Sequence, residues 1–321
     1  MVLTITLNPL LEKRYEVENF NKGELTKSNK TYFTAGGKGI NVSRQLNNLG
    51  IKNQALTFLG GNTGKILRSV LTDEKINFVV SSTRSNTRES VLILDKKNRN
   101  VTTLMESSPI LSKQDALELK SKLKKMIQNV TIVVLSGSSP SEYADSIFPY
   151  AIELANQNDK IVILDTYGKH LKSCFEKKPM ITHQNVFEIE SSFNIKINSE
   201  KDKINYLKSL YDSGIKISFL TDGANPAYVC KFGFIYKIVP PKINAVDSTG
   251  CGDAFIAGVA YGLEKSMVFE DILEFSTQLS VANALSFETC NVDINSANSI
   301  KDFKIEEIGN KMKLIDDSPN Y

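Results

Sequence analysis

The sequence has few cysteines, and no pattern gathers them. Its 321 residues include four cysteines that lie far apart, at Cys174, Cys230, Cys251 and Cys290, and only two histidines. There is no Cys-x-x-Cys pair and no Cys/His cluster, which excludes the usual zinc-site spacings. A chain of this length can bury a large core and does not need a disulfide framework. We therefore expect reduced thiols and a cytoplasmic protein.

The chain also lacks long apolar runs and an excess of charge of one sign. No segment approaches the length that crosses a membrane, and the N-terminus has no basic stretch followed by a long apolar one, as a secretory signal has. The 39 lysines and arginines nearly balance the 36 aspartates and glutamates, which gives a net charge of +3. This balance argues against nucleic acid or a membrane surface as a partner.

Short apolar strands alternate with helical segments along most of the chain. Runs such as "VVLSG", "VILDT" and "ISFLTDG" each follow a stretch with apolar residues at helical spacing. Continuous apolar strands separated by helices indicate a parallel sheet covered by helices on both faces. We expect one α/β domain over residues 1–321, with its ligand at the carboxyl ends of the strands. Two stretches, 14–35 and 83–105, break the alternation and are candidates for a small β flap.

A glycine-rich segment, "NAVDSTGCGDAFIAG" at residues 244–258, comes directly before an apolar helical run. Gly250 and Gly252 allow a tight turn that points backbone N–H groups at an anion near the helix start. Asp253 lies in the first turn, where its carboxylate would repel a bound phosphate. This placement makes sense if Asp253 accepts the proton of a hydroxyl that attacks the phosphate. The plainer alternative is a glycine turn whose acid favours the helix dipole.

A second glycine-rich segment, "TAGGKGINVSRQLNNLG" at residues 34–50, lies at a strand-to-helix junction. Gly36 and Gly37 let a ligand approach the backbone, and Lys38 offers charge to a phosphate. Asn41 can both donate to and accept from a sugar hydroxyl. An ordinary turn between strand and helix is the alternative. Neither this segment nor "GGNTGKI" at residues 60–66 has P-loop spacing, which excludes a P-loop NTPase.

Together these segments resemble the PfkB (ribokinase-like) carbohydrate kinases, and within them the phosphosugar branch of 1-phosphofructokinases and tagatose-6-phosphate kinases. The resemblance covers nearly the whole chain and rests on "TITLNP", "AGGKGIN", "NTRESVLIL", "VVLSGSSP", "VILDT", "NVFE", "DSTGCGDAFIAG" and "SVANAL". It implies a ribokinase-like three-layer α/β sandwich with a mostly parallel central sheet and a small β lid made from the two irregular stretches. It also implies ATP-dependent transfer of the γ-phosphoryl group to a hydroxyl of a ketohexose phosphate, giving a bisphosphate.

The same resemblance implies roles for individual residues. Asp253 would be the base, beside an anion hole made by Gly250, Cys251 and Gly252. The sugar would be held by Glu12, Gly36, Gly37, Lys38 and Asn41, and its phosphate by Lys27, Arg88 and Ser138. A guanidinium can grip phosphate through two bonds, which makes Arg88 the best of these three. ATP would be bound by Asn185, Thr221, Gly223 and Asn283, and Mg²⁺ by Asn185 and Glu188, mostly through water.

Some of these residues have plainer alternatives, and four positions depart from the family pattern. Arg88 could form a surface ion pair, while Asn185 and Glu188 could cap a helix. Glu12 stands where aspartate is usual, which should shift the carboxylate by about 1 Å. The other departures lie near the nucleotide, at Cys251, His183–Gln184 and Pro226. Because proline has a fixed φ and no N–H, we expect a changed nucleotide loop and a changed ATP affinity.

Three functions stay open at this point. The first is an active phosphosugar kinase, the second a PfkB kinase for an unphosphorylated sugar or nucleoside, and the third a kinase-like sensor that binds sugar phosphate with little turnover. The sequence does not choose among fructose 1-phosphate, tagatose 6-phosphate and fructose 6-phosphate. A lid strand with an exposed edge often pairs with another subunit, so we expect a homodimer through the lid.

Overall fold

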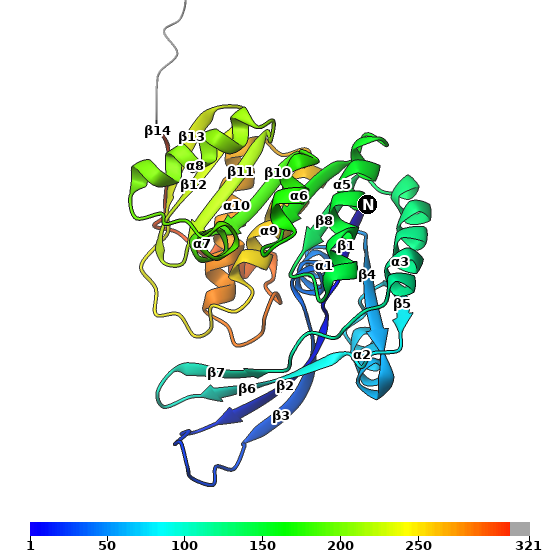
Figure 1. The fold of residues 1–321 in the computed structure, drawn as a ribbon. Helices are drawn as coiled ribbons and strands as arrows, with labels where there is room; N and C mark the ends of the chain where they lie inside the picture. The colour runs from blue at the N-terminus through cyan, green and yellow to red at the C-terminus, as the bar shows by residue number, and fades with distance from the viewer. Residues whose placement is uncertain (309–321) are drawn as a thin grey trace, which may run out of the picture.

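A ten-stranded sheet forms the centre of the computed structural model, which describes residues 1–308 (Figure 1). The strand order is β14-β13-β12-β11-β10-β9-β8-β1-β4-β5. The strands are β1 (Val2–Thr6), β4 (Asn53–Gly60), β5 (Phe78–Thr83), β8 (Ile132–Ser136), β9 (Ile161–Asp165), β10 (Ile181–Asn185), β11 (Ile217–Asp222), β12 (Asn225–Lys231), β13 (Phe234–Val239) and β14 (Lys304–Ile308). Residues 309–321 of the predicted domain lie outside the described part.

Most of this sheet is parallel, as the alternation of strands and helices predicts. The strands from β5 to β11 pair in parallel, whereas β12, β13 and β14 pair antiparallel at one end. Strands β1 and β8 are buried along their whole length. Apolar, β-branched residues suit such strands because both of their faces are covered.

Helices cover the two faces of the sheet and complete three layers. One core packs α3 (Lys113–Met126), α5 (Ile147–Asn156), α6 (Leu171–Glu176) and α8 (Glu200–Asp212) on one face. A second core packs α1 (Lys38–Asn48), α9 (Cys251–Glu264), α10 (Phe269–Ala284) and α11 (Ile294–Asn298) on the other. The remaining helices are α2 (Gly61–Asp73), η1 (Ile127–Asn129), α4 (Glu142–Asp145) and α7 (Val186–Phe193). The predicted three-layer sandwich is confirmed.

A second sheet projects from one end of this body, and we call it the lid (Figure 1). Its order is β3-β2-β6-β7, formed by β2 (Leu10–Val17), β3 (Lys30–Gly36), β6 (Arg88–Asp95) and β7 (Asn100–Met105). It begins four residues before the predicted stretch 14–35. The predicted stretch 83–105 holds its other two strands. Helix α2 packs beneath it, where Leu67 joins Leu11 and Ala35 in a small third core.

The pairing of the lid strands assigns its side chains to two faces. Glu12, Thr34 and Ser90 form one cross-strand row, and Arg14 lies on the same face two residues along β2. The next row consists of Lys13, Phe33, Val91 and Leu104, which therefore lie on the opposite face. The lid thus presents one set of residues toward the body and another away from it.

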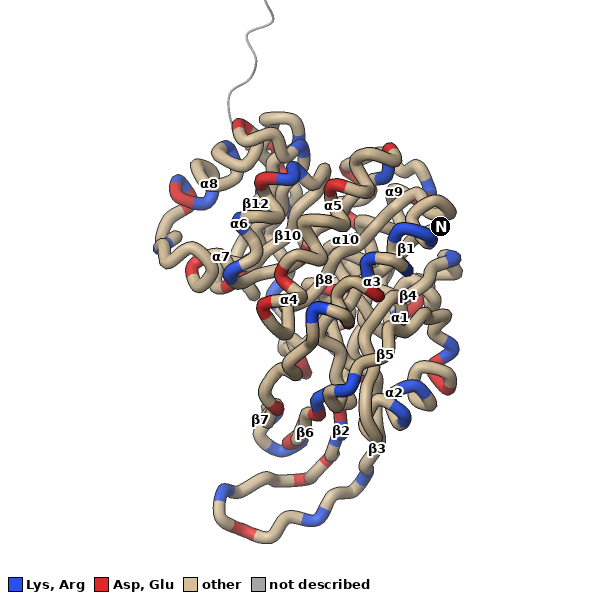
Figure 2. Tube along the Cα trace, turned by 45° about the vertical axis from the view of Figure 1, so that its right-hand side comes forward, with Lys and Arg blue, Asp and Glu red and all other residues tan. Residues whose placement is uncertain are grey.

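Charge is spread evenly over the molecule. Basic and acidic residues alternate along the described trace in Figure 2, including the long loop between β2 and β3 at the tip of the lid. Within residues 1–308, no helix has both the length and the apolar character needed to cross a membrane.

Candidate active site

A cleft of about 1240 Å³ lies between the lid and the carboxyl ends of the parallel strands. That volume exceeds the usual upper range for one small ligand, roughly 1,000 Å³, and leaves room for two substrates. Its lining comes from β2, β3 and β6 of the lid, from the turn before α1, and from the turn before α9. The position agrees with the rule that ligands of such sheets bind at the carboxyl ends of strands.

The turn before α9 has the geometry that its glycines predict. Gly250 has a φ of 78°, in the left-handed region, and directly precedes Cys251, the first residue of the helix. A Cβ on Gly250 would lie 2.3 Å from Cγ2 of Thr289, so space as well as φ requires glycine here. Gly252 follows in the first turn, where a Cβ would lie 3.1 Å from Cε1 of His183. The helix start therefore brings backbone N–H groups close to the cleft.

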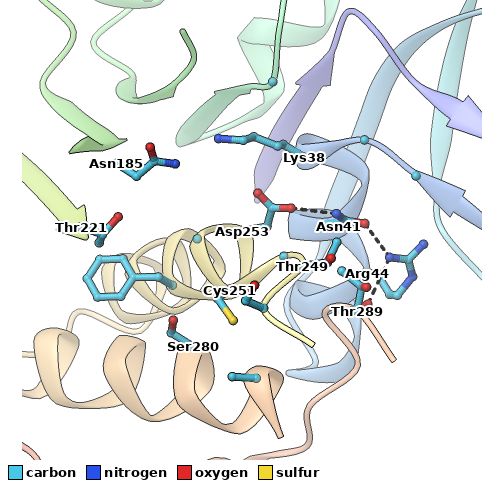
Figure 3. A pocket seen from close by; sticks show the side chains of 18 of the residues that line it. Lys38, Asn41, Arg44, Asn185, Thr221, Thr249, Cys251, Asp253, Ser280 and Thr289 are labelled. Atoms are coloured by element: carbon cyan, nitrogen blue, oxygen red, sulfur yellow. Dashed lines mark hydrogen bonds between the residues drawn. The ribbon is translucent and has the colours of Figure 1, made fainter. Parts of the chain in front are cut away.

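Asp253 is buried, 4% exposed, at the floor of the cleft (Figure 3). Its Oδ2 accepts a hydrogen bond of 2.7 Å from Nδ2 of Asn41. Burial raises the pKa of Asp253 to about 7, with the charges of Asp165 and Glu188 adding to the rise and Lys38 opposing it. A carboxylate with a pKa near the working pH is suited to accept a proton during catalysis.

Lys38 is fixed among acidic groups above Asp253 (Figure 3). Its Nζ lies 2.6 Å from Oε1 of Glu188 and 3.2 Å from Oδ1 of Asp165. Burial lowers the pKa of Lys38, but the two carboxylates outweigh burial and the net shift is upward. The ammonium therefore stays charged in the cleft, where it can attract a phosphate.

Asp165 is a central residue of the site that was not singled out from the sequence. Asp165 is fully buried at the end of β9. Besides Lys38, it contacts two side chains: its Oδ2 accepts a hydrogen bond of 2.7 Å from Oγ of Ser136, and its Oδ1 lies 2.9 Å from Nδ1 of His183. Despite burial, which raises it, the pKa of Asp165 is held below its usual value by Lys38 and His183. The sequence signal that could have found it is the aspartate that directly follows the apolar run in "VILDT", at the carboxyl end of a predicted strand.

Asn185 and Glu188 cap the start of α7, as the plainer alternative from the sequence predicts, and they also line the cleft. Oδ1 of Asn185 accepts from the N–H of Glu188 at 2.8 Å, and Oε2 of Glu188 accepts from the N–H of Asn185 at 3.0 Å. In residues 1–308 no three acidic, histidine or cysteine side chains gather into a cation cage. Asn185 and Glu188 present oxygen atoms at the edge of the cleft, the type of ligand that Mg²⁺ prefers.

Arg88 lies at the lid end of the cleft with little to bind. Its Nη2 donates to the carbonyl of Asn8 at 3.1 Å and its Nη1 to Sδ of Met105 at 3.2 Å, while its buried Nε has no partner within residues 1–308. No acidic residue within residues 1–308 pairs with it, so it does not form the surface ion pair that was the alternative. Nδ2 of Asn8 donates to Oγ of Ser138 at 3.0 Å, so Asn8 links Ser138 and Arg88 in the lining of the cleft. An unpaired cation next to hydroxyl and amide groups suits a phosphate.

Glu12 lies in the cleft but is held by side chains of β2 and β3. Nε of Arg14 lies 2.5 Å from Oε1 of Glu12, and Oγ1 of Thr34 donates to the same oxygen at 3.2 Å. Arg14 continues across to the main body, where it donates to the carbonyl of Phe287 and to Oγ1 of Thr289. Within residues 1–308 the other oxygen, Oε2 of Glu12, accepts no hydrogen bond and is available to a hydroxyl of a ligand.

Two predicted residues do not line the cleft. Lys27 is exposed in the loop between β2 and β3 at the tip of the lid. Asn283 is buried behind the glycine turn, where its Nδ2 donates to the carbonyl of Thr249 at 2.9 Å and its Oδ1 accepts from the N–H of Cys290 at 2.7 Å. Asn283 therefore supports the turn and does not face the cleft. All the other predicted site residues line it.

Thr221 and Gly223, predicted to bind the nucleotide, line the cleft at the end of β11. Pro226 lies near the start of β12, where it is not paired with a residue of β11 or β13, so the missing N–H removes no hydrogen bond between strands. His183 lies beside Thr221, with its Nε2 3.2 Å from Oγ1 of Thr221. Burial raises the pKa of the Cys251 thiol to about 11, so the thiol stays neutral at the helix start.

Comparison with known proteins identifies the family. The profile of the pfkB family carbohydrate kinases matches residues 3–295. The chain belongs to this family. The predicted resemblance is confirmed, and within the pfkB family the similarity extends over nearly the whole length of several relatives.

Two of these relatives are named as phosphosugar kinases. A 1-phosphofructokinase of Borreliella burgdorferi is 33% identical over 293 residues, which cover 90% of this chain and 94% of that protein. A tagatose-6-phosphate kinase of Staphylococcus epidermidis is 28% identical over 325 residues, which cover 98% of this chain and 100% of that protein. The chain is therefore similar over nine tenths of its length or more to pfkB kinases of both names.

Solved structures agree with the fold. A protein of Thermotoga maritima that carries the name "possible 1-phosphofructokinase" superposes with a TM-score of 0.89 at 26% identity, covering 96% of this chain and all of the other. Phosphofructokinase-2 of Escherichia coli superposes with a TM-score of 0.84 at 21% identity, covering 93% and 97%. The predicted ribokinase-like architecture of this pfkB kinase is confirmed.

Proposed function

We propose that this carbohydrate kinase transfers the γ-phosphoryl group of ATP to a hydroxyl of a ketohexose phosphate, either fructose 1-phosphate or tagatose 6-phosphate. One observation carries the proposal. The cleft that holds Asp253 also holds Arg88, a partly buried guanidinium with no acidic partner in residues 1–308. A cation of this kind is costly to bury unless an anion completes it. The phosphate already present on the substrate is that anion.

The reaction follows from the residues of the cleft. The sugar hydroxyl loses its proton to Asp253 while its oxygen forms a bond to the γ-phosphorus, and the bond from that phosphorus to the bridging oxygen of ADP breaks. The glycine turn before α9 provides N–H donors for the charge on the transferred group. Lys38 adds a positive charge on the opposite side. Closing of the lid over the sugar would exclude water and limit wasteful hydrolysis of ATP.

ATP and Mg²⁺ fit the other half of the cleft. Thr221 and Gly223 line it at the end of β11, and apolar residues such as Ile238 and Pro240 offer a surface for the base. The donor set of Asn185 and Glu188 fits a Mg²⁺ ion that keeps several waters and uses phosphate oxygens as ligands. When bound, Mg²⁺ would neutralise charge on the phosphates.

The other two functions are less well supported. A kinase for an unphosphorylated sugar or nucleoside would leave Arg88 without a counter-ion. A sensor with little turnover would not need Asp253, whose pKa of about 7 suits it to accept a proton. Neither alternative accounts for both residues in one cleft.

A homodimer through the lid is part of the same proposal. The row of lid residues that points away from the body includes Phe33 and Leu104, which are 43% and 64% exposed. This row, apolar apart from Lys13, is suited to be covered by a second copy. Lys27, on the adjoining loop, would then lie close to the other copy. We also keep the proposals of one kinase domain over residues 1–321 and of a cytoplasmic location, where its charged substrates would be made.

A coupled assay of ADP release tests the proposed reaction. It would compare the three ketohexose phosphates with free fructose and free ribose, using wild-type protein and Asp253→Asn side by side. Turnover of one phosphosugar by the wild type, lost in the variant, supports the proposal. Turnover of a free sugar at a higher kcat/KM than any phosphosugar would replace it with the second function.

A further inference from the structure

The amide of Asn41 lies between the base and an arginine on the same helix (Figure 3). Its Nδ2 donates to Oδ2 of Asp253 at 2.7 Å, and its Oδ1 accepts from Nη1 of Arg44 at 2.8 Å. Asn41 and Arg44 are three residues apart on α1, which is the spacing at which side chains on one helix meet.

Arg44 is itself held on several sides. Its Nε and Nη2 lie 2.9 and 2.6 Å from Oε2 of Glu74, the residue that directly follows α2. Its Nη2 also donates to the carbonyl of Ala35 and its Nη1 to the carbonyl of Thr289. The other oxygen of Glu74 accepts from the N–H of Ala35 at 2.9 Å. The Glu74–Arg44 pair is therefore bound to both backbone groups of Ala35, near the end of lid strand β3.

A guanidinium can only donate hydrogen bonds, and this decides how the Asn41 amide is turned. With Arg44 in place, Asn41 must present its oxygen to the arginine and its NH₂ group to Asp253. The reverse orientation would set two donors against each other at Arg44 and two acceptors against each other at Asp253. The donated hydrogen bond favours the ionised form of the carboxylate, which is the form that accepts a proton.

We propose that Arg44, held by Glu74, is a positioning residue that fixes the Asn41 amide so that Asp253 is oriented and kept ready to accept the proton of the sugar hydroxyl. This inference rests on the proposed role of Asp253 as the base. The side chains of Lys38, Asp165, Glu188, Cys251 and Cys290 also face Asp253, but within residues 1–308 none of them forms a hydrogen bond with Asn41 or Arg44. Because the pair is bound to Ala35, the end of a lid strand is connected to the base through three side chains.

The test is the pH dependence of kcat/KM in Arg44→Met and Arg44→Lys. Without Arg44 the Asn41 amide is free to turn, so Asp253 should hold its proton to higher pH. We expect the acid limb of the profile in Arg44→Met to move up by about one pH unit, which corresponds to a loss of about fivefold at pH 7 that approaches roughly tenfold at lower pH. Arg44→Lys, which can still donate to Asn41, should recover part of the loss. Arg68→Met, an exposed arginine on α2, is the matched control and should keep the wild-type profile.

A double variant separates positioning from a structural effect. If Arg44 acts through Asn41, Arg44→Met should cause no further loss and no further shift in an Asn41→Leu background. A uniform loss at every pH, or an equal further loss in that background, overturns the inference. Should Arg44→Met fail to fold, Glu74→Gln takes its place. We expect the acid limb of its pH profile to shift in the same direction by a smaller amount. An acid limb at the wild-type pH in Glu74→Gln would overturn the inference. Full activity of Asp253→Asn would instead remove the base itself, so the two failures are distinguishable.

Discussion

At the scale of single residues, Asp253 carries a conflict between function and stability. Its pKa is raised from 3.8 to about 7, so the folded chain holds this proton more tightly than the unfolded chain does. This tighter proton binding contributes its full free energy of stabilisation below about pH 3.8, and the contribution is lost as the pH rises through about 7. At the pH where it works as a base, the residue therefore destabilises the fold.

Replacing Asp253 with asparagine should relieve this cost. Asparagine keeps an oxygen that can accept from Asn41 but carries no charge. We expect Asp253→Asn to melt several °C above the wild type at pH 8, a gain on the order of 1 kcal/mol, and close to it at pH 4. Thermal unfolding at both values measures this. A variant that is less stable than the wild type at pH 8 would show that the ionised carboxylate is well solvated or paired.

Arg88 offers the clearest test of substrate choice at this scale. Arg88→Met removes the free guanidinium from the lid end of the cleft. Since hydrogen bonds to charged groups contribute about 2–3 kcal/mol, KM for the sugar phosphate should rise by roughly 30- to 100-fold while KM for ATP changes little. Steady-state kinetics with each substrate varied in turn gives both values.

Arg84→Met is the control for this experiment, because Arg84 is exposed nearby between β5 and β6 and does not line the cleft. It should leave both constants unchanged. An equal effect of Arg88→Met on the two substrates would argue against a phosphate contact by Arg88.

At the scale of elements, the start of α9 depends on Gly250. Gly250→Ala places a methyl group 2.3 Å from Cγ2 of Thr289 and forces a side chain into the left-handed region. Either the turn or the loop at 287–289 must move, so we expect kcat to fall at least tenfold and stability by about 1–3 kcal/mol. Activity assays and thermal unfolding of the same preparation measure the two losses.

Gly50→Ala separates the effect of space from that of backbone strain. Gly50 also has a left-handed φ, of 69°, but a Cβ there meets no atom within 4 Å. This variant should lose roughly 1 kcal/mol of stability and keep its kcat. If both variants lost activity to the same degree, the contact with Thr289 would not matter for the anion hole.

The elements themselves were largely predictable, because periodicity and glycine spacing are local signals. The runs around β8 and β9, the turn before α9 and the capping pair of α7 are all readable over ten residues or fewer. What was missed depends on contacts between distant segments. Arg14 reaches Phe287, Arg44 reaches Glu74, and Asn283 turns back to Thr249. No spacing within one segment indicates such pairs, which exist only once the layers have packed.

At the scale of the whole molecule, the lid raises the question of assembly. Leu104→Glu puts a charge in the row that includes Phe33 and Val91 on the outer face of the lid. If this face is covered by a second copy, the variant should be a monomer where the wild type is a dimer. Light scattering after size exclusion measures the mass. Leu117→Glu, at a 50% exposed position on α3, is the control and should stay dimeric.

The most direct test of the central claim, that one cleft joins a base to a clamp for a sugar phosphate, is to follow the phosphorus atoms. Wild-type protein and Asp253→Asn would be incubated with Mg-ATP and each of the three ketohexose phosphates, and the products observed by ³¹P NMR. We predict that one sugar phosphate is converted to a bisphosphate, with one ADP formed for each, and that Asp253→Asn slows this by about 10²-fold or more. No bisphosphate from any of the three, with sugar phosphate still bound by calorimetry, would contradict the claim and favour a sensor.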